Sequence, residues 1–243
     1  MEIKDLKIIP SGDTLTLRQG EAAVALDPYD YQGFKYAALS TKAFATLVKR
    51  KGSKENAVIF ANSKGFFAIL DDTVKDRTQD TISLDFILST KCEEWGAILK
   101  GEQVFNIKQL IDFLKRRDEN EIENMEEIIY AVRNFKYVST VTGDFTYDDR
   151  SNYVFSFKVK DAEGTVRIPQ TIMATIEVFK DSEWPQAMEI EVEVQKPKEE
   201  GEGPLLKLSC PKWLRYLESA KDYEFTTLEK ELTDWLLVTG YSK

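Results

Sequence analysis

Residues 188–194 read MEIEVEV, so an apolar side chain alternates with a glutamate through the whole stretch. A period of two is typical of a β-strand with one face on a core and the other in water. Residues 153–159 and 172–178 also carry an apolar side chain at every second position. The three stretches together predict an antiparallel sheet in the C-terminal half of the chain.

The N-terminal third also predicts strands. Residues 57–61 and 66–70 are short apolar stretches, and the polar residues 62–65 (NSKG) between them are typical of a hairpin turn. Residues 81–86 alternate and predict a third strand. Short strands are also predicted nearer the start of the chain, at residues 6–9, 14–17 and 22–26.

Helices are predicted between and after these strands. Ser40 or Thr41 caps a first short helix, and Asn106 with Gln109 forms a capping box for another. Apolar residues at helical spacing predict further helices at 90–99, 124–135, from Pro211 onward, and after a capping box at Thr226 and Glu229.

The expected fold is therefore α+β, with mixed or antiparallel sheets, a central helical segment and C-terminal helices. We expect one domain over residues 1–243, with two lobes as an alternative. In that alternative, residues 1–90 hold the N-terminal strands and one helix, residues 91–135 the helical segment, and residues 136–243 the antiparallel sheet with the C-terminal helices.

Composition excludes several chemistries. The chain contains no histidine, so a Ser-His-Asp or Cys-His nucleophile system is excluded. The phosphate-binding patterns GxxxxGK[ST] and GxGxxG are absent. The chain is acidic, with a net charge of −9. These features favour a binding protein over an enzyme, and no cofactor is expected.

A cytoplasmic location is expected. No apolar stretch approaches the roughly 20 residues that span a bilayer, so no membrane partner is expected. Residues 1–10 contain four charged side chains and do not resemble a secretory signal. Cys92 and Cys210 are too far apart to form a metal-binding pair by spacing, and both are expected to be reduced.

Basic and aromatic residues suggest a surface for single-stranded nucleic acid. Basic residues gather at the ends of two predicted helices, where cations also favour the helix dipole. An aromatic loop precedes the first cluster, and rings beside cations are typical of single-strand binding. The candidate residues are Lys49, Arg50, Lys51, Lys54, Arg116, Arg117, Tyr29, Tyr31 and Phe34.

Acidic residues suggest an alternative site for Mg²⁺ or Mn²⁺. Asp71 and Asp72 follow an apolar strand directly, and Asp144 and Asp148 lie in a second acidic segment. Carboxylate oxygens are the ligands these cations prefer. A solvated turn for the first pair and a plain inter-strand loop for the second are favoured over a metal site.

The order of segments resembles the YfdQ-like proteins of bacteriophages and prophages. The resemblance rests on residues 57–61 and 66–72, the stretch around Trp95, residues 168–179, and the closing strand and helix. It spans roughly residues 36–240 and implies a phage or prophage origin, hence the cytoplasm of a host cell. This family has no known catalytic residues to transfer.

Three functions remain open at this point. The first is a non-enzymatic binding protein that acts on a host or phage protein, a small signalling ligand or a DNA-metabolism complex. The second is a single-stranded nucleic-acid-binding accessory of phage recombination. The third is a carboxylate-metal hydrolase. An exposed sheet edge would also permit a homo-oligomer.

Overall fold

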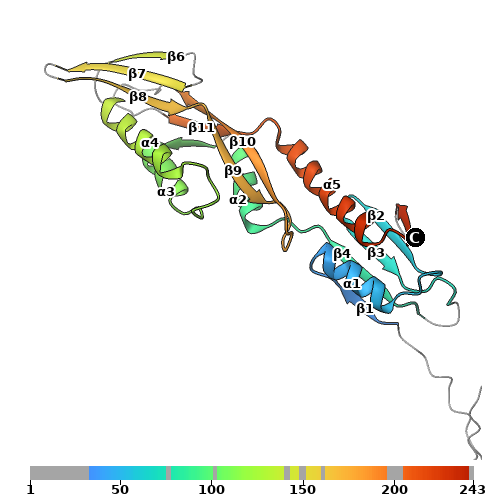
Figure 1. The fold of residues 1–243 in the computed structure, drawn as a ribbon. Helices are drawn as coiled ribbons and strands as arrows, with labels where there is room; N and C mark the ends of the chain where they lie inside the picture. The colour runs from blue at the N-terminus through green and yellow to red at the C-terminus, as the bar shows by residue number, and fades with distance from the viewer. Residues whose placement is uncertain are drawn as a thin grey trace, which may run out of the picture.

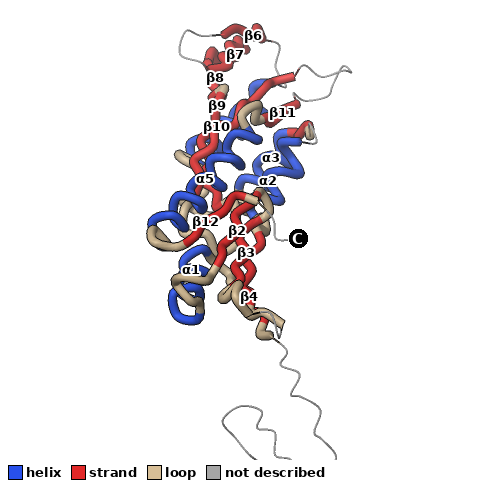
Figure 2. Tube along the Cα trace, turned by 90° about the vertical axis from the view of Figure 1, so that its right-hand side faces the viewer, coloured by secondary structure: helices blue, strands red, loops and turns tan. Residues whose placement is uncertain are grey.

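The computed structural model describes residues 33–74, 78–100, 103–139, 143–147, 152–159, 162–195 and 205–240, with backbone alone between 135 and 167. The fold of these residues is α+β, as the sequence predicts. Three sheets follow one another along an elongated molecule, and each has at least one helix packed beside it (Figures 1 and 2). The strands predicted before residue 30 lie outside the described residues.

The first sheet is mixed. Its order is β1 (Lys35–Ala37), β4 (Thr81–Asp85), β3 (Gly65–Ile69), β2 (Val58–Asn62) and β12 (Leu236–Thr239). The pairs among β2, β3 and β4 are antiparallel, whereas β1 runs parallel to β4 and β12 runs parallel to β2. The N-terminal sheet is therefore completed by a strand from the far end of the sequence.

The predicted hairpin between β2 and β3 is confirmed. Its turn ends at Gly65, whose φ of +147° favours glycine. A Cβ at this position would lie 1.9 Å from the Leu84 carbonyl oxygen, so the close approach of β4 also requires glycine.

Helix α1 (Thr41–Lys51) packs on the first sheet. Ser40 is its N-cap and accepts a hydrogen bond from the Ala43 N–H at 3.3 Å, as the sequence predicts. Phe44 and Val48 from this helix are fully buried against strand residues such as Ile59 and Ile82. These contacts form the N-terminal core.

The second sheet is antiparallel, as predicted for residues 172–178 and 188–194, but the third alternating stretch, residues 153–159, lies in a separate antiparallel sheet. Its order is β5 (Val104–Asn106), β11 (Leu205–Ser209), β10 (Pro185–Gln195) and β9 (Thr171–Glu177). The apolar residues of MEIEVEV point into a core, with Met188 and Ile190 fully buried.

Helices α2 (Thr90–Lys100) and α3 (Ile107–Leu114) cover this sheet, whereas α4 (Met125–Ser139) packs on α3 and along the strand Ala162–Pro169 of the third sheet (Figure 1). Ile128 and Val132 of α4 still belong to the central core. The predicted capping box at the start of α3 is present, because Asn106 and Gln109 each accept the other's backbone N–H. Trp95 and Leu114 are fully buried between the helices and the sheet. These contacts form the central core.

The third sheet has the order β6 (Gly143–Tyr147), β7 (Asn152–Val159) and β8 (Ala162–Pro169). All its pairs are antiparallel. It lies at the end of the molecule away from α1, beyond the central sheet (Figures 1 and 2).

The C-terminal region corrects one prediction. Instead of two helices, residues 213–231 form one continuous helix, α5 (Trp213–Glu231), and Thr226 lies in its interior. Leu236, expected in the apolar stripe of the last helix, instead begins the strand β12. Trp213 and Ala220 belong to the central core, whereas Leu228 and Leu232 belong to the N-terminal core. One helix and the residue that ends it therefore contribute to both cores.

Candidate functional site

The two hydrophobic cores meet at a narrow junction, here called the waist. The chain crosses it through residues 86–89, between β4 and α2, and again through α5. Residues 86–89 lie against the β9–β10 connection: Leu88 forms a β-bridge with Phe179, and Ser89 N–H donates to the Val178 carbonyl at 2.9 Å. Ligand sites are common at such junctions between two packed units.

Aromatic rings fill the waist. The ring centroids of Phe86 and Phe179 are 4.8 Å apart with an interplanar angle of 20°. Phe66 and Phe225 meet Phe86 edge-on or nearly so, at 5.1 and 6.2 Å. Phe86 packs against both cores, so its ring has a fixed position.

An open groove lies on this aromatic junction, here called the waist groove. Its volume is about 450 Å³, within the roughly 300–1,000 Å³ of small-molecule sites. Four parts of the fold contribute to it: the β2–β3 turn, the segment from the end of β4 to Leu88, the β9–β10 connection and α5. Its lining residues are Ser63, Lys64, Asp85, Phe86, Leu88, Phe179, Leu217 and Lys221.

Two lysines stand at the rim of this apolar floor. Among the described residues, the ammonium groups of Lys64 and Lys221 make no hydrogen bond or ion pair, and neither does the Asp85 carboxylate. The backbone of Lys64 is held on both sides: its N–H donates to Asn62 Oδ1 at 2.8 Å, and its carbonyl accepts from Phe86 N–H at 2.7 Å. The groove therefore offers two available cations against one carboxylate, beside rings whose positions are fixed.

The connection at residues 178–184 holds the waist together. Buried Glu224 of α5 accepts hydrogen bonds from the hydroxyls of Ser182 (2.6 Å) and Thr41. Trp184 stacks on Tyr223 of α5, with centroids 4.9 Å apart. These contacts tie α5 to the β9–β10 connection and to the start of α1.

Lys42 and Glu183 form an ion pair at the surface of the waist. The hydrogen bond that Lys42 donates to the Glu183 carboxylate raises the pKa of Lys42 above its ordinary value. Because both side chains are more than half exposed, we expect little stability from this pair.

A second hollow, of about 290 Å³, lies between α4 and β9. Its polar rim consists of Glu123, Asn124 and Glu127, and its floor includes Ile172 and Met173. Both glutamates are exposed to solvent. Two solvated acids at the rim, with no available cation in the lining, do not indicate a ligand, so this hollow is not our candidate.

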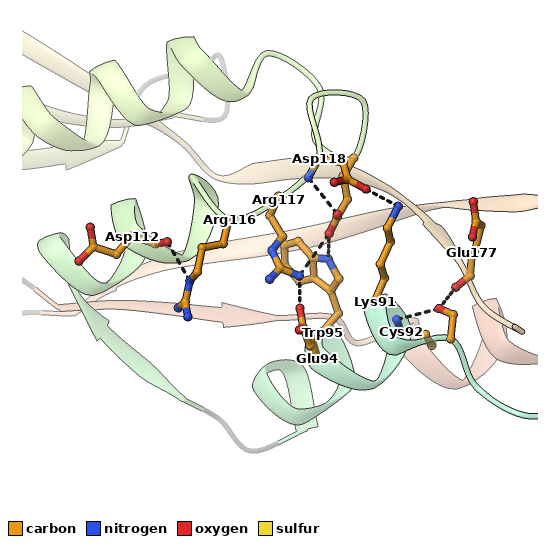
Figure 3. Close-up of polar contacts among 11 residues, drawn as sticks. Lys91, Cys92, Glu94, Trp95, Asp112, Arg116, Arg117, Asp118 and Glu177 are labelled. Atoms are coloured by element: carbon orange, nitrogen blue, oxygen red, sulfur yellow. Dashed lines mark hydrogen bonds and ion pairs between the residues drawn. The ribbon is translucent and has the colours of Figure 1, made fainter.

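Figure 3 shows where Arg117 lies. Its side chain is only 8 % exposed, and Nη1 lies 2.5 Å from Glu94 and 3.6 Å from Glu121. Its guanidinium carbon lies 4.6 Å from the centre of the Phe113 ring. These internal contacts occupy Arg117, which leaves little of it for a nucleic-acid phosphate.

The same network includes Trp95, whose Nε1 donates to Glu121 at 2.6 Å (Figure 3). Lys91 pairs with Asp118 at 2.7 Å, and their hydrogen bond raises the pKa of Lys91 and lowers that of Asp118. The network joins α2 to the loop after α3. Its role is to hold these elements together.

The basic residues near the end of α1 are partly neutralised. Lys49 pairs with Glu231 at 2.6 Å, and Lys54 pairs with Asp234 at 3.1 Å. The Lys49 hydrogen bond lowers the pKa of Glu231. Arg50 and Lys51 are exposed, and no ion pair engages them within the described residues. Acids at and just after the end of α5 therefore neutralise two of these four basic residues.

The remaining nucleic-acid candidates are scattered. Arg116 is exposed, and its Nε donates to the Asp112 carbonyl at 3.1 Å. Phe34 is 59 % exposed, and its ring lies 6.2 Å from that of Tyr36. Tyr29 and Tyr31 lie outside the described residues. Arg116 belongs to the loop after α3 and Phe34 precedes β1, so the two lie in different parts of the fold.

The acidic candidates do not assemble either. Asp71 accepts hydrogen bonds from the backbone and hydroxyl of Thr73, which is typical of a turn. Asp72 accepts one from Gln79 at 3.4 Å. Over the residues with described side chains, no three Cys, Asp or Glu residues form a metal-binding group.

Two acidic candidates are not placed in full. Asp144 lies on β6 opposite Ser156 in register, in a sheet described by its backbone alone. Asp148 lies outside the described residues.

Sequence reasoning missed the waist groove. Its lining comes from four stretches that lie up to about 160 residues apart, at 63–64, 85–88, 179 and 217–221. Lys64 was visible as part of a turn, but no local pattern marks it or Lys221 as members of one site. These residues can be recognised as one site only after the fold has brought the four stretches together.

Comparisons with known proteins do not assign the chain to a family. No protein-family model matches the chain, and neither a curated protein nor a solved structure matches it. The resemblance to the YfdQ-like proteins therefore stays a prediction. Among the described helices, none combines the length and apolar character that crossing a membrane requires.

Proposed function

We propose that this protein acts by binding, and that the waist groove holds an apolar ligand that carries a negative charge. The observation that carries the proposal is the pair of available lysines, Lys64 and Lys221, beside the stacked rings of Phe86 and Phe179. Ring faces and leucines favour an apolar group by removing it from water. Ammonium groups near such a floor favour an anion beside it.

Binding without catalysis is the function that these residues support best. The groove contains one carboxylate, Asp85, and no histidine or cysteine. A single exposed acid lacks the partner base or nucleophile that general acid–base or covalent catalysis needs.

Anilinonaphthalene sulfonate is a suitable probe, because it joins aromatic rings to one anionic group. We expect saturable fluorescence enhancement with the full chain. Changing Lys64→Gln and Lys221→Gln together should weaken binding at least about fivefold, through loss of two charge-assisted contacts. The matched control is Lys108→Gln, an exposed lysine of α3 that has no ion pair with any described residue and does not line the groove.

Leu217→Glu offers a second variant, because it places a negative charge on the half-buried floor. Circular dichroism and urea midpoints must first show that each variant is folded. The proposal would be overturned if the double lysine variant and Leu217→Glu each bound the probe as tightly as the wild type does.

The predicted nucleic-acid surface makes a different prediction. If it operates, fluorescence anisotropy with single-stranded DNA at low salt will detect binding that Arg50→Ala and Lys51→Ala remove. The waist-groove proposal expects no such loss, since neither residue lines the groove.

A further inference from the structure

We propose that the occupant of the waist groove is a segment of a protein partner in which acidic residues flank an apolar or aromatic side chain. This inference rests on the binding function proposed above and names the class of ligand. It follows from the length of the apolar surface, the position of the positive charge and the exposure of one leucine.

The apolar surface continues beyond the groove along α5. Leu214, Leu217 and Lys221 are spaced i, i+3 and i+7, so they share one face of the helix. Leu214 is 70 % exposed, one turn before the leucine that lines the groove. From Leu214 to Lys221 the helix rises about 10 Å, which extends the surface past the groove itself.

A smaller hollow continues the surface in another direction. It shares Asp85, Phe86 and Phe179 with the groove as common walls. It also includes Leu39, which is 70 % exposed. Leucines this exposed therefore stand beyond the groove in two directions, which suits an extended chain better than a compact small molecule.

The positive charge on this surface lies mainly in the waist groove and not in the smaller hollow. The lining of the groove includes two lysines, Lys64 and Lys221, and one carboxylate, Asp85. In the smaller hollow Lys180 is offset by Asp181 and by Glu224, which two hydroxyls already engage. The acidic residues of a bound segment should therefore lie on the Lys64–Lys221 side, and its apolar residues toward Leu39 or Leu214.

The proposed contact has the layout common to peptide grooves. One large apolar side chain would pack on Phe86 and Leu217, where the floor is already fixed by neighbouring rings. Carboxylates next to it would reach Lys64 and Lys221, whose ammonium groups have no partner among the described residues. Such a central anchor with a charged rim is typical of interfaces in which few residues supply most of the affinity.

A random dodecapeptide library displayed on phage and panned against the full chain tests this inference. The expected clones combine Asp or Glu with Phe, Trp, Leu or Ile. A synthetic peptide from the dominant clone should bind in an anisotropy assay. Leu214→Ala and the double change Lys64→Gln with Lys221→Gln should each weaken its binding at least about fivefold.

Two control variants match these changes. Tyr130→Ser removes an apolar side chain that is 67 % exposed on α4, away from the waist, and Lys108→Gln removes an exposed charge on α3. Both should leave peptide binding unchanged.

The outcomes separate this inference from the proposed function. If no clone is enriched, or if the peptide binds the Leu214 and lysine variants as tightly as the wild type, the inference is wrong. When anilinonaphthalene sulfonate still needs both lysines in that case, the groove is a site for small aromatic acids. When the dye is also indifferent to the lysines, the proposed function fails as well.

Discussion

At position 117 a guanidinium is almost completely enclosed by protein. Arg117→Met would keep the packing on Phe113 but leave Glu121, which is 3 % exposed, without its nearest cation. Removing one partner of a buried ion pair typically costs about 3–5 kcal/mol. Because Glu94 is half exposed and can regain water, we expect a loss of about 2–4 kcal/mol by urea denaturation.

Arg116→Met is the neighbouring control for this change. Its side chain is exposed, so its replacement should change the free energy of unfolding by less than about 0.5 kcal/mol. Equal effects of the two substitutions would contradict the structural role assigned to Arg117.

Cys92 predicts how stability depends on alkaline pH. Burial raises the pKa of its thiol from 9.0 to about 11. The unfolded chain therefore releases this proton at lower pH than the folded chain, and stability should fall between about pH 9 and 11, by up to about 2–3 kcal/mol. Below pH 9 both states keep the proton and the effect vanishes.

Urea unfolding at pH 8 and pH 10.5 measures this loss. Cys92→Ala should lose less stability between the two pH values than the wild type does. Cys210, whose pKa is also raised by burial, is retained in both proteins and so does not affect the comparison. An identical loss in both proteins would show that Cys92 does not titrate as expected.

At the level of single elements, the β2–β3 turn makes a sharp prediction. Gly65→Ala would bring a Cβ to 1.9 Å from the Leu84 carbonyl oxygen and would strain a φ of +147°. Backbone strain alone costs about 1–3 kcal/mol, so the total loss should exceed about 2 kcal/mol in thermal or urea unfolding.

Gly240→Ala separates strain from collision. Its φ is +156°, yet nothing lies within 4 Å of the added Cβ. We expect it to cost clearly less than Gly65→Ala. If the two changes cost the same, the contact with β4 contributes nothing.

Elements whose signals are local were predictable from the sequence. The α1 cap at Ser40, the α3 capping box and the β2–β3 hairpin each depend on residues within a few positions of one another. The alternation in residues 188–194 likewise needs no distant partner to indicate a strand. Local rules decide the two helix caps and the hairpin because their hydrogen bonds join residues close in sequence.

The C-terminal elements depend on distant contacts and were predicted incorrectly. Leu228, Leu232 and Leu236 have helical spacing, but Leu236 pairs with Val58 on β2, 178 positions away. Thr226 and Glu229 have the spacing of a capping box, yet α5 continues through them because Leu228 is fully buried in the N-terminal core. The waist groove was invisible for the same reason.

At the scale of the whole molecule, α5 should couple the two cores. Trp95 reports on the central core and Trp235 packs against the N-terminal core. Leu228→Ala would remove a fully buried side chain from the N-terminal core and cost about 2–5 kcal/mol. We expect it to shift the unfolding of both regions together.

Two proteins, each keeping one of these tryptophans and replacing the other three with Phe, allow the two regions to be followed separately by fluorescence. Their urea midpoints should coincide with and without Leu228→Ala. A shift for Trp235 alone would show that the cores unfold independently despite the shared helix.

The position of β12 has a consequence for the synthesis of the protein. Strand β2, at residues 58–62, leaves the ribosome long before its parallel neighbour at residues 236–239 has been made. Domains usually fold as units during translation, beginning at the N-terminus. Here the first sheet must wait with one edge of β2 unpaired until residues 236–239 have been translated. During that interval the nascent chain exposes a β-strand edge, a feature that chaperones bind and that other nascent chains can join.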